Sequence, residues 1–254
     1  MSVIRVDNFI DAYRIRAHAP DIHAMAARRK EATEFVSECV LQALELEATD
    51  TLVDIGCGDG CLLRMAEGMV AKRMGIVATE DEKKRLEPTM RGAAIVKGLC
   101  QQLPLPSESA SKVVCNGVLF YLSSADEVRA SLREMARIAR PGARVWVGEI
   151  PIVDEFEKFG MYCGSSVIGL LRHTLVTNGP RAFLGMLRRL AKSLVGRDQV
   201  VLNSARLFHA TPEEFVKLAE GSGLRLESYS RHRDIDKEGN PVVSQLRYDY
   251  LFCK

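Results

Sequence analysis

Between residues 31 and 150 the chain switches repeatedly between a helical spacing of apolar side chains and short apolar runs. Over 31–46 apolar residues recur three and four positions apart, which predicts an amphipathic helix. A short apolar run at 51–55 predicts a strand, and after a glycine-rich loop the helical spacing returns at 61–69. Further strands are expected at 75–79, 93–96, 112–115 and 144–149.

Another helix is expected before the last of these strands. Ser124 and Glu127 form a capping-box pattern at its start, and Arg140-Pro-Gly142 predicts the turn that ends it. Strands that alternate with helices at this pace are typical of βαβ units. The sequence therefore predicts an α/β fold, Rossmann-like and doubly wound, with a mostly parallel sheet.

The C-terminal part has a different rhythm. The residues TPEE at 211–214 predict a helix start with proline at the first helical position, and the helix is expected to end at Gly221. Alternating residues at 224–229 and 246–252 predict two strands. We expect these strands to add an antiparallel pair at one edge of the sheet.

Length and composition fit a single domain over residues 1–254. Hydrophobic residues make up 47% of the chain and charged residues 27%, as in an ordinary globular protein that buries a full core. The stretches 1–30 and 151–210 are too long to be simple connectors between helices and strands. The sequence thus divides into an N-terminal flap (1–30), a cofactor-binding core (31–150), a helical substrate lid (151–210) and a C-terminal helix with edge strands (211–254).

Net charge and cysteine content limit the partners and the cellular compartment that fit the sequence. A net charge of +2 is too small to indicate a nucleic-acid or membrane partner by itself. The seven cysteines are scattered and include no CxxC pair, which favours reduced thiols over a disulfide framework or a metal site. The sequence shows neither a signal peptide nor the roughly 18 apolar residues of a membrane span. We expect a cytoplasmic protein without a metal.

The loop LVDIGCGDG at 52–60 follows the first strand of the expected sheet. A glycine loop at this position lets a ligand approach the backbone, but the spacing G-x-G-x-G differs from that of dinucleotide enzymes. Asp54 and Asp59 would repel a pyrophosphate there and attract a cation. S-adenosylmethionine carries an ammonium and a sulfonium group. Glu80, expected at the end of the second strand, has the spacing of an acid that binds a ribose.

Four motifs follow one another in the order VDIGCGDG, ATE, LPLPSESASKVVCNGVLFYL and ARPGARVWVGE. In this the chain resembles the class I S-adenosylmethionine-dependent methyltransferases, within them the small-molecule branch that is similar to quinone and sterol methyltransferases. The resemblance covers about residues 50–150 and implies S-adenosylmethionine as the cofactor. The cofactor-binding residues it implies are Asp54, Gly56, Cys57, Gly58, Gly60, Glu80, Asp81, Leu99, Cys100, Asn116 and Tyr121.

In this resemblance Asp54 orients the amino group of the cofactor and Glu80 binds the ribose, with Asp81 as a neighbour able to replace it. The family pattern Gly-Asp-Ala before LPLP, whose Asp contacts the adenine amino group, is replaced by GLC at 98–100. A leucine side chain cannot accept a hydrogen bond. Adenine recognition is therefore expected to depend on the backbone or on Gln101.

The stretch 172–197 carries six basic residues and no acidic one, with apolar residues at helical spacing between them. Three roles fit such a basic amphipathic helix: it holds an anionic substrate, contacts an acidic carrier protein, or rests on a membrane surface. A lid helix whose cations are only solvated explains the pattern equally well. Nucleic acid is not expected, because no aromatic residues are interleaved with the basic ones to form a stacking platform.

Methyl transfer from a sulfonium is an in-line displacement, so the protein has to align the reactants and exclude water. A base is needed only when the acceptor loses a proton during the attack. The candidate bases are His209, Glu149, His173 and Tyr121. Tyr13 and His18 are candidates for a flap over the site.

The predicted function is methylation of an oxygen, nitrogen or carbon atom of a small, anionic or amphipathic metabolite. The sequence lacks the Asn-Pro-Pro-Tyr motif of enzymes that methylate amino groups of nucleic acids, which supports a small-molecule acceptor. Two alternatives stay open: a lipid or quinone acceptor at the membrane surface, and a catalytically inert cofactor-binding partner or regulatory protein. A homo-oligomer, a carrier-bound substrate and peripheral membrane contact are also compatible with the sequence.

Overall fold

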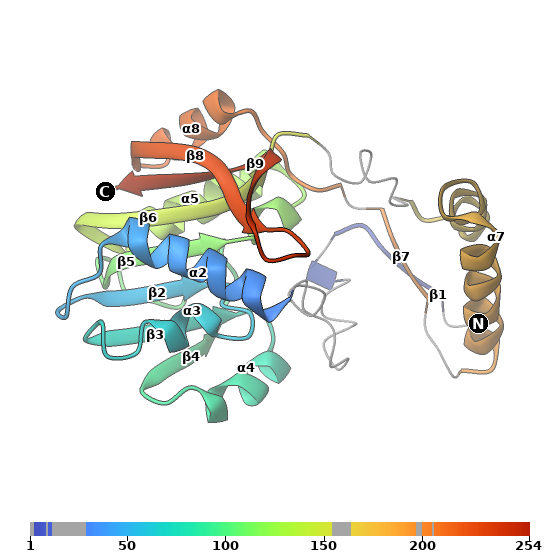
Figure 1. Cartoon of the computed structure of the whole chain (residues 1–254), viewed down its shortest axis with the longest axis horizontal. Helices are drawn as coiled ribbons and strands as arrows, with labels where there is room; N and C mark the ends of the chain where they lie inside the picture. Colours follow the sequence, from blue (N-terminus) through green and yellow to red (C-terminus); the bar gives the residue numbers. More distant parts are fainter. Residues whose placement is uncertain (1–2, 9, 12–28, 154–163, 197–199, 205) are drawn as a thin grey trace.

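A seven-stranded sheet forms the centre of the molecule (Figure 1). The computed structural model describes residues 3–8, 10–11, 29–153, 164–196, 200–204 and 206–254. The strand order is β4-β3-β2-β5-β6-β9-β8, in which the first five strands are parallel and β9 is antiparallel to both neighbours. The strands are β2 (Thr51–Ile55), β3 (Lys72–Val77), β4 (Ala93–Lys97), β5 (Ala110–Asn116), β6 (Ala139–Pro151), β8 (Arg225–Ile235) and β9 (Pro241–Cys253).

The strand β2 lies between β3 and β5, at the point where the strand order reverses. The chain continues from β2 toward one edge through β3 and β4, and then returns to the other side of β2 as β5. Doubly wound sheets bind ligands at the carboxyl ends of the strands at such a point. The predicted α/β fold, with a mostly parallel sheet and an antiparallel C-terminal edge pair, is confirmed.

Helices cover both faces of the sheet. On one face Val40, Leu63 and Leu86 of three successive helices share a buried cluster with Leu52 of β2. The next residue, Val53, belongs to a second cluster on the other face, as expected for a strand that is covered on both sides. The helices are α2 (Lys30–Leu44), α3 (Cys61–Met65) and α4 (Glu80–Leu86) on the first face, and α5 (Ala125–Ile138) and α8 (Pro212–Glu220) on the second.

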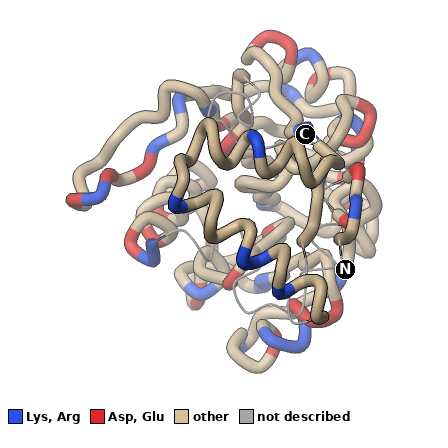
Figure 2. Tube along the Cα trace, turned by 90° about the vertical axis from the view of Figure 1, so that its right-hand side faces the viewer, with Lys and Arg blue, Asp and Glu red and all other residues tan. Residues whose placement is uncertain are grey.

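A smaller unit joins the start of the chain to the predicted lid. The strand β7 (Val200–Asn203) pairs in parallel with β1 (Val3–Val6), and Leu190 of α7 (Val167–Leu194) is buried beside them. Figure 1 shows this unit beside the seven-stranded sheet, and α7 faces the viewer in Figure 2. Among the described residues, no helix has both the length and the apolar character needed to cross a membrane.

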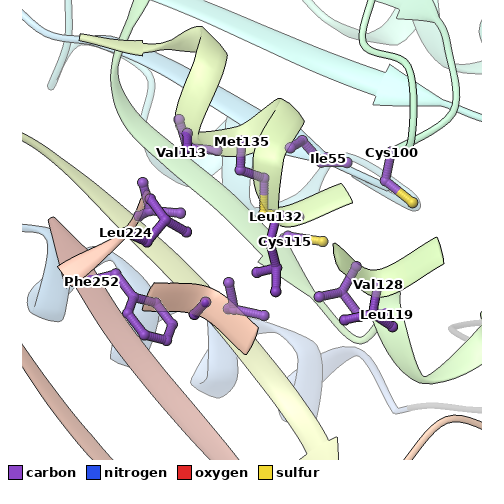
Figure 3. Packing of buried hydrophobic residues seen from close by; sticks show 14 of the residues in the cluster. Ile55, Cys100, Val113, Cys115, Leu119, Val128, Leu132, Met135, Leu224 and Phe252 are labelled. Atoms are coloured by element: carbon purple, nitrogen blue, oxygen red, sulfur yellow. The ribbon is translucent and has the colours of Figure 1, made fainter. Parts of the chain in front are cut away.

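The cluster between α5 and the sheet is shown in Figure 3. Val128, Leu132 and Met135 lie on one face of α5 and pack with Val113 and Cys115 of β5. All five side chains are fully buried. This packing fixes β5 and the loop that leaves its carboxyl end.

Some element boundaries differ from the prediction. The helix α3 ends at Met65, and the turn expected at 140–142 lies within β6, where Gly142 has a φ of +78°. The strand β3 ends at Val77 rather than at 79. Both β8 and β9 are longer than expected, because they form an extended hairpin whose outer part reaches beyond the pairing with β6.

Candidate active site

The glycine loop leaves the carboxyl end of β2 at the centre of the sheet. The amides of Gly56 and Cys57 both donate to the Ile76 carbonyl, at 2.9 and 3.2 Å, which holds the loop over the end of β3. Gly56 has a φ of +73°, and a Cβ at this position would lie 2.4 Å from Cγ2 of Val118. A side chain there would strain the backbone and displace the loop after β5. The glycine thus allows the two loops to meet.

A pocket opens between this loop, the end of β5 and one face of α2. It brings together five of the predicted cofactor-binding residues: Asp54, Gly56, Cys57, Gly58 and Asn116. The sequence did not identify the part of the lining that α2 contributes, because helical spacing indicates which face is buried but not what that face meets. The residues from α2 are Thr33, Val36, Ser37 and Val40.

Asp54 is the buried carboxylate of this pocket, with 5% of the residue exposed. Burial, together with the charge of Asp59, raises the pKa of the Asp54 carboxyl from its ordinary 3.8 to about 7. Asp59 is itself half exposed: its Oδ1 accepts from the Cys61 amide at 2.9 Å, and its Oδ2 lies 3.5 Å from Nη2 of Arg64. A cation bound beside Asp54 would favour its ionised form, whereas an anion would disfavour it.

Asn116 is the last residue of β5, and two residues of β6 hold its side-chain amide by hydrogen bonds to its oxygen and its nitrogen. Its Oδ1 accepts from Nε1 of Trp146 at 3.1 Å, and its Nδ2 donates to Oε1 of Glu149 at 2.9 Å. The other carboxylate oxygen of Glu149 accepts from Nη1 of Arg247 on β9 at 2.5 Å. Each oxygen of Glu149 therefore accepts a hydrogen bond from a neighbouring strand. In this structure the candidate base acts as an anchor for Asn116.

A bulge in β6 places Glu149 in this position. The bulge lies between Val147 and Ile150, where two residues of β6 oppose one of β9, and Glu149 has a φ of +63°. The Glu149 amide donates to Oδ1 of Asp249 at 2.8 Å, and Oδ2 of Asp249 lies 2.9 Å from Nδ1 of the buried His232. No motif in the sequence marks Asp249 or His232 as part of the site.

Glu80 is the first residue of α4 and does not lie at the end of a strand. Thr79 caps this helix: its Oγ1 accepts from the Glu82 amide at 3.3 Å, and its own amide donates to Oε2 of Glu82 at 3.0 Å. Glu80 is exposed and Asp81 is partly buried. Neither residue lines the pocket of the glycine loop, so their contact with a ribose stays a prediction.

The stretch expected to face the adenine runs beside the end of β3. The Gly98 amide donates to the Val77 carbonyl at 2.9 Å, and Leu99 is partly buried. Cys100 belongs to the core between the sheet and α5, where Oγ of Ser131 lies 3.3 Å from its Sγ. The side chain of Cys100 is therefore packed into the core and does not line the pocket.

Three further predicted residues have different surroundings. The thiol of Cys57 is packed into the core, and burial raises its pKa, which keeps it protonated. Gly60 directly precedes α3. The ring centroid of Tyr121 lies 4.0 Å from that of Phe120, and the guanidinium of Arg247 lies 5.0 Å from the Phe120 centroid. The Phe120 ring therefore contacts both Tyr121 and Arg247.

The two candidate histidines do not line the pocket of the glycine loop. His209 is exposed in a separate depression between α5 and α8, and His173 lies on α7. Tyr13 and His18 lie outside the described residues. Within the described ranges, no group of three His, Cys, Asp or Glu residues is placed to hold a metal ion.

Residues 53–147, which run from β2 into β6, match a family model described as a methyltransferase domain. The matched region contains the glycine loop, Asp54 and Asn116. Over these residues the chain is thus similar to methyltransferase domains. The lid unit and the C-terminal hairpin lie outside the residues that the family model covers.

Among proteins with similar sequences is 27-O-demethylrifamycin SV methyltransferase of Amycolatopsis mediterranei. It is 29% identical over 135 residues, which cover 50% of this chain and 48% of that protein. The chain spans about half the length of the curated relatives it matches. The similarity thus covers only part of either protein.

Solved structures with a similar overall fold align with most of this chain. The N-methyltransferase NodS from Bradyrhizobium japonicum WM9, in complex with S-adenosyl-L-homocysteine, has a TM-score of 0.60 at 12% identity, covering 98% of this chain and 99% of that one. The cyclase SpnF has a TM-score of 0.58 at 15% identity, covering 91% and 78%. At these identities the likeness is one of fold alone, and one fold serves different reactions.

Proposed function

We propose that this protein transfers a methyl group from S-adenosylmethionine to a small molecule. The observation that carries the proposal is the buried carboxylate of Asp54 beside a glycine loop, at the point where the strand order reverses. Burial and the charge of Asp59 raise the pKa of Asp54, and a bound cation would offset both effects. The ammonium group of S-adenosylmethionine is such a cation.

The residues present fit this cofactor. The loop 56–60 leaves the backbone open to a ligand, and Asp54 would hold the ammonium group. Glu80 and Asp81, at the start of α4, would hold the ribose, and Leu99 offers apolar surface to the adenine. When bound, S-adenosylmethionine supplies an electrophilic methyl group on its sulfonium.

The contribution of the chain's own side chains is alignment and exclusion of water. Hydrogen bonds with Trp146 and Glu149 hold the Asn116 side chain in the pocket wall. Little conformational entropy of this side chain is therefore lost when a ligand binds. Glu149 positions Asn116 through its hydrogen bond to Nδ2, and it stays a candidate base. Tyr121 is another candidate base, and its ring lies against the Phe120 ring that Arg247 also contacts.

We expect the acceptor to be a small anionic or amphipathic metabolite. The predicted lid supports this class, because α7 presents both basic and apolar side chains. The same helix favours a lipid or quinone as a second candidate acceptor. A cytoplasmic location and a homo-oligomeric state remain predictions from the sequence.

The experiment incubates the purified protein with S-adenosylmethionine and pools of small acceptors, and measures S-adenosylhomocysteine. Acceptor-dependent product that is lost in Asp54→Ala supports the proposal. The matched control is Asp126→Ala, which removes an exposed carboxylate on α5. Cofactor binding without product from any small molecule, quinone or lipid indicates the inert alternative. A protein that binds no S-adenosylmethionine contradicts the proposal.

A further inference from the structure

We propose that α7 docks onto the surface of membranes that contain anionic lipids. Most of the large apolar side chains that the described residues expose to solvent lie on α7 and at its C-cap. Four others lie elsewhere in the described chain, at Met69, Tyr229, Val242 and Val243. The exposed fractions in the α7 set are 79% for Ile168, 45% for Leu175, 78% for Val176, 55% for Leu184, 37% for Leu187, 61% for Leu194 and 67% for Val195.

Only part of the apolar surface of α7 is covered by its own unit. Leu190 and Ser193 are buried on the side that packs against β7. Leu184, Leu187 and Leu194 follow one another at steps of three and seven, so they form a separate stripe along the C-terminal half of the helix.

Basic residues border this exposed stripe. Arg181, Arg188 and Lys192 are spaced by seven and four, which places them on one line beside the leucines, and all three are exposed. From 164 to 196 the chain contains five Lys or Arg residues and no Asp or Glu. Figure 2 shows the same asymmetry, with Lys and Arg but no acidic residue along α7.

An apolar stripe bordered by cations is the arrangement by which an interfacial helix binds a bilayer. The apolar side chains enter the boundary between headgroups and acyl chains, while the cations meet lipid phosphates. A second copy of α7 would instead bring two sets of positive charges together. Anionic lipid is therefore the occupant that satisfies both parts of this surface.

A break in the middle of α7 divides it into two shorter helices, and each of them carries part of the exposed apolar surface. Gly179 has a φ of 82° and a ψ of 176°, and Pro180 follows it. Ile168 and Val176 are exposed before the break and the leucine stripe after it. Neither half contributes to the lining of the pocket of the glycine loop. The inference therefore does not depend on the proposed methyl transfer.

Vesicle flotation of the full chain tests this inference. The vesicles contain phosphatidylcholine alone or phosphatidylcholine mixed with phosphatidylglycerol, and no cofactor is added. We expect flotation only with the anionic vesicles, and release by high salt. Two variants address the two parts of the surface, Arg181→Glu/Arg188→Glu for the charge and Leu184→Ser/Leu187→Ser/Leu194→Ser for the apolar stripe. Each is expected to lower the partition coefficient about tenfold or more.

Matched controls make the same changes elsewhere on the surface. Val242→Ser/Val243→Ser removes exposed apolar side chains of β9, and Arg225→Glu/Lys237→Glu reverses exposed charges around β8. Both controls are expected to float like the unchanged protein, and circular dichroism checks that every variant is folded. The charge variant alters only exposed side chains, so it keeps the test valid if the triple serine variant fails to fold.

Three outcomes overturn the proposal. The first is no flotation with anionic vesicles, and the second is flotation that both α7 variants leave unchanged. The third is a dimer in sedimentation that the serine variant dissociates while no form binds vesicles, which assigns the stripe to a second copy. Asp54→Ala is expected to float normally, so a failure of the cofactor site and a failure of membrane docking give different results.

Discussion

Asn116 and Glu149 join the carboxyl ends of β5 and β6 through a hydrogen bond of 2.9 Å between Nδ2 and Oε1. The residue opposite Asn116 on β6 is Gly148, and a Cβ there would lie 1.9 Å from Oδ1 of Asn116. Asn116 lines the pocket of the glycine loop, and Glu149 binds Arg247 of β9. The pocket wall is therefore tied to the antiparallel edge of the sheet.

Gly148→Ala is expected to displace the Asn116 side chain from this pair. The added methyl group cannot fit without movement, and overpacking of this kind costs about 1–3 kcal/mol in the free energy of unfolding. Urea unfolding measures the loss, and titration with S-adenosylmethionine measures the weakened binding. Gly185→Ala is the control, because no atom lies within 4 Å of a Cβ at this helical position. That variant is expected to be as stable as the unchanged protein or more stable.

Arg247→Met leaves the Glu149 carboxylate buried without its cation. The side chain of Glu149 is 6% exposed and that of Arg247 is 25% exposed, so the expected loss is about 2–4 kcal/mol in the free energy of unfolding. The double variant Glu149→Gln/Arg247→Met should recover much of it, since the buried carboxylate that lost its partner is then uncharged. Arg129→Met breaks a pair whose Asp126 is 87% exposed, and should cost less than about 1 kcal/mol. Equal losses in the two methionine variants would contradict the account.

Asp54→Asn is expected to stabilise the cofactor-free protein, and more so at neutral than at acidic pH. The pKa of Asp54 is raised in the folded state from 3.8 to about 7, so folding opposes its ionisation. The stability of the unchanged protein therefore falls as the pH rises through this window, whereas the asparagine variant lacks this contribution. Urea unfolding near pH 5 and near pH 8 measures the difference between the two proteins. A difference that does not grow with pH would show that Asp54 ionises freely.

Thr79→Ala removes the cap of α4 at the residue before Glu80. Loss of such a cap costs about 1 kcal/mol, and it should also loosen the start of the helix that carries the proposed ribose-binding acids. Thr211→Ala is the matched control, since Thr211 and Glu214 form the same capping box on α8. Thr79→Ala should lose more stability, because Thr79 and Glu82 are buried whereas Thr211 and Glu214 are exposed. Only Thr79→Ala should bind S-adenosylmethionine more weakly. Calorimetry that finds equal cofactor affinity in both would remove α4 from the site.

The sequence was sufficient for the parts of the fold that depend on local patterns. The strand Thr51–Ile55 and the helix Pro212–Glu220 lie where the apolar run and the capping residues predict them. The pairing of β1 with β7 could not be predicted, because it joins residues from opposite parts of the chain. The alternation of apolar and polar residues at 246–252 indicated a strand, but it did not indicate which neighbouring strands it would pair with.

In the site, too, local motifs could be predicted from the sequence, whereas contacts between distant residues could not. Asp54 and Asn116 each follow from a motif at the end of a parallel strand, and both line one pocket. His209 is close in sequence to a capped helix, yet the face on which it lies depends on tertiary packing. The partners of Glu149 come from β9, so only the folded sheet brings Arg247 and Asp249 to it.

Titration calorimetry with S-adenosylmethionine tests the central claim most directly. We predict saturable binding to the unchanged protein, with an affinity that rises with pH up to about 7 as Asp54 ionises. Asp54→Ala should bind about tenfold more weakly or worse, since it loses a charged partner for the ammonium group, and Asp126→Ala should bind normally. Absence of binding at every pH, or equal affinity in Asp54→Ala, would contradict the assignment of the cofactor site.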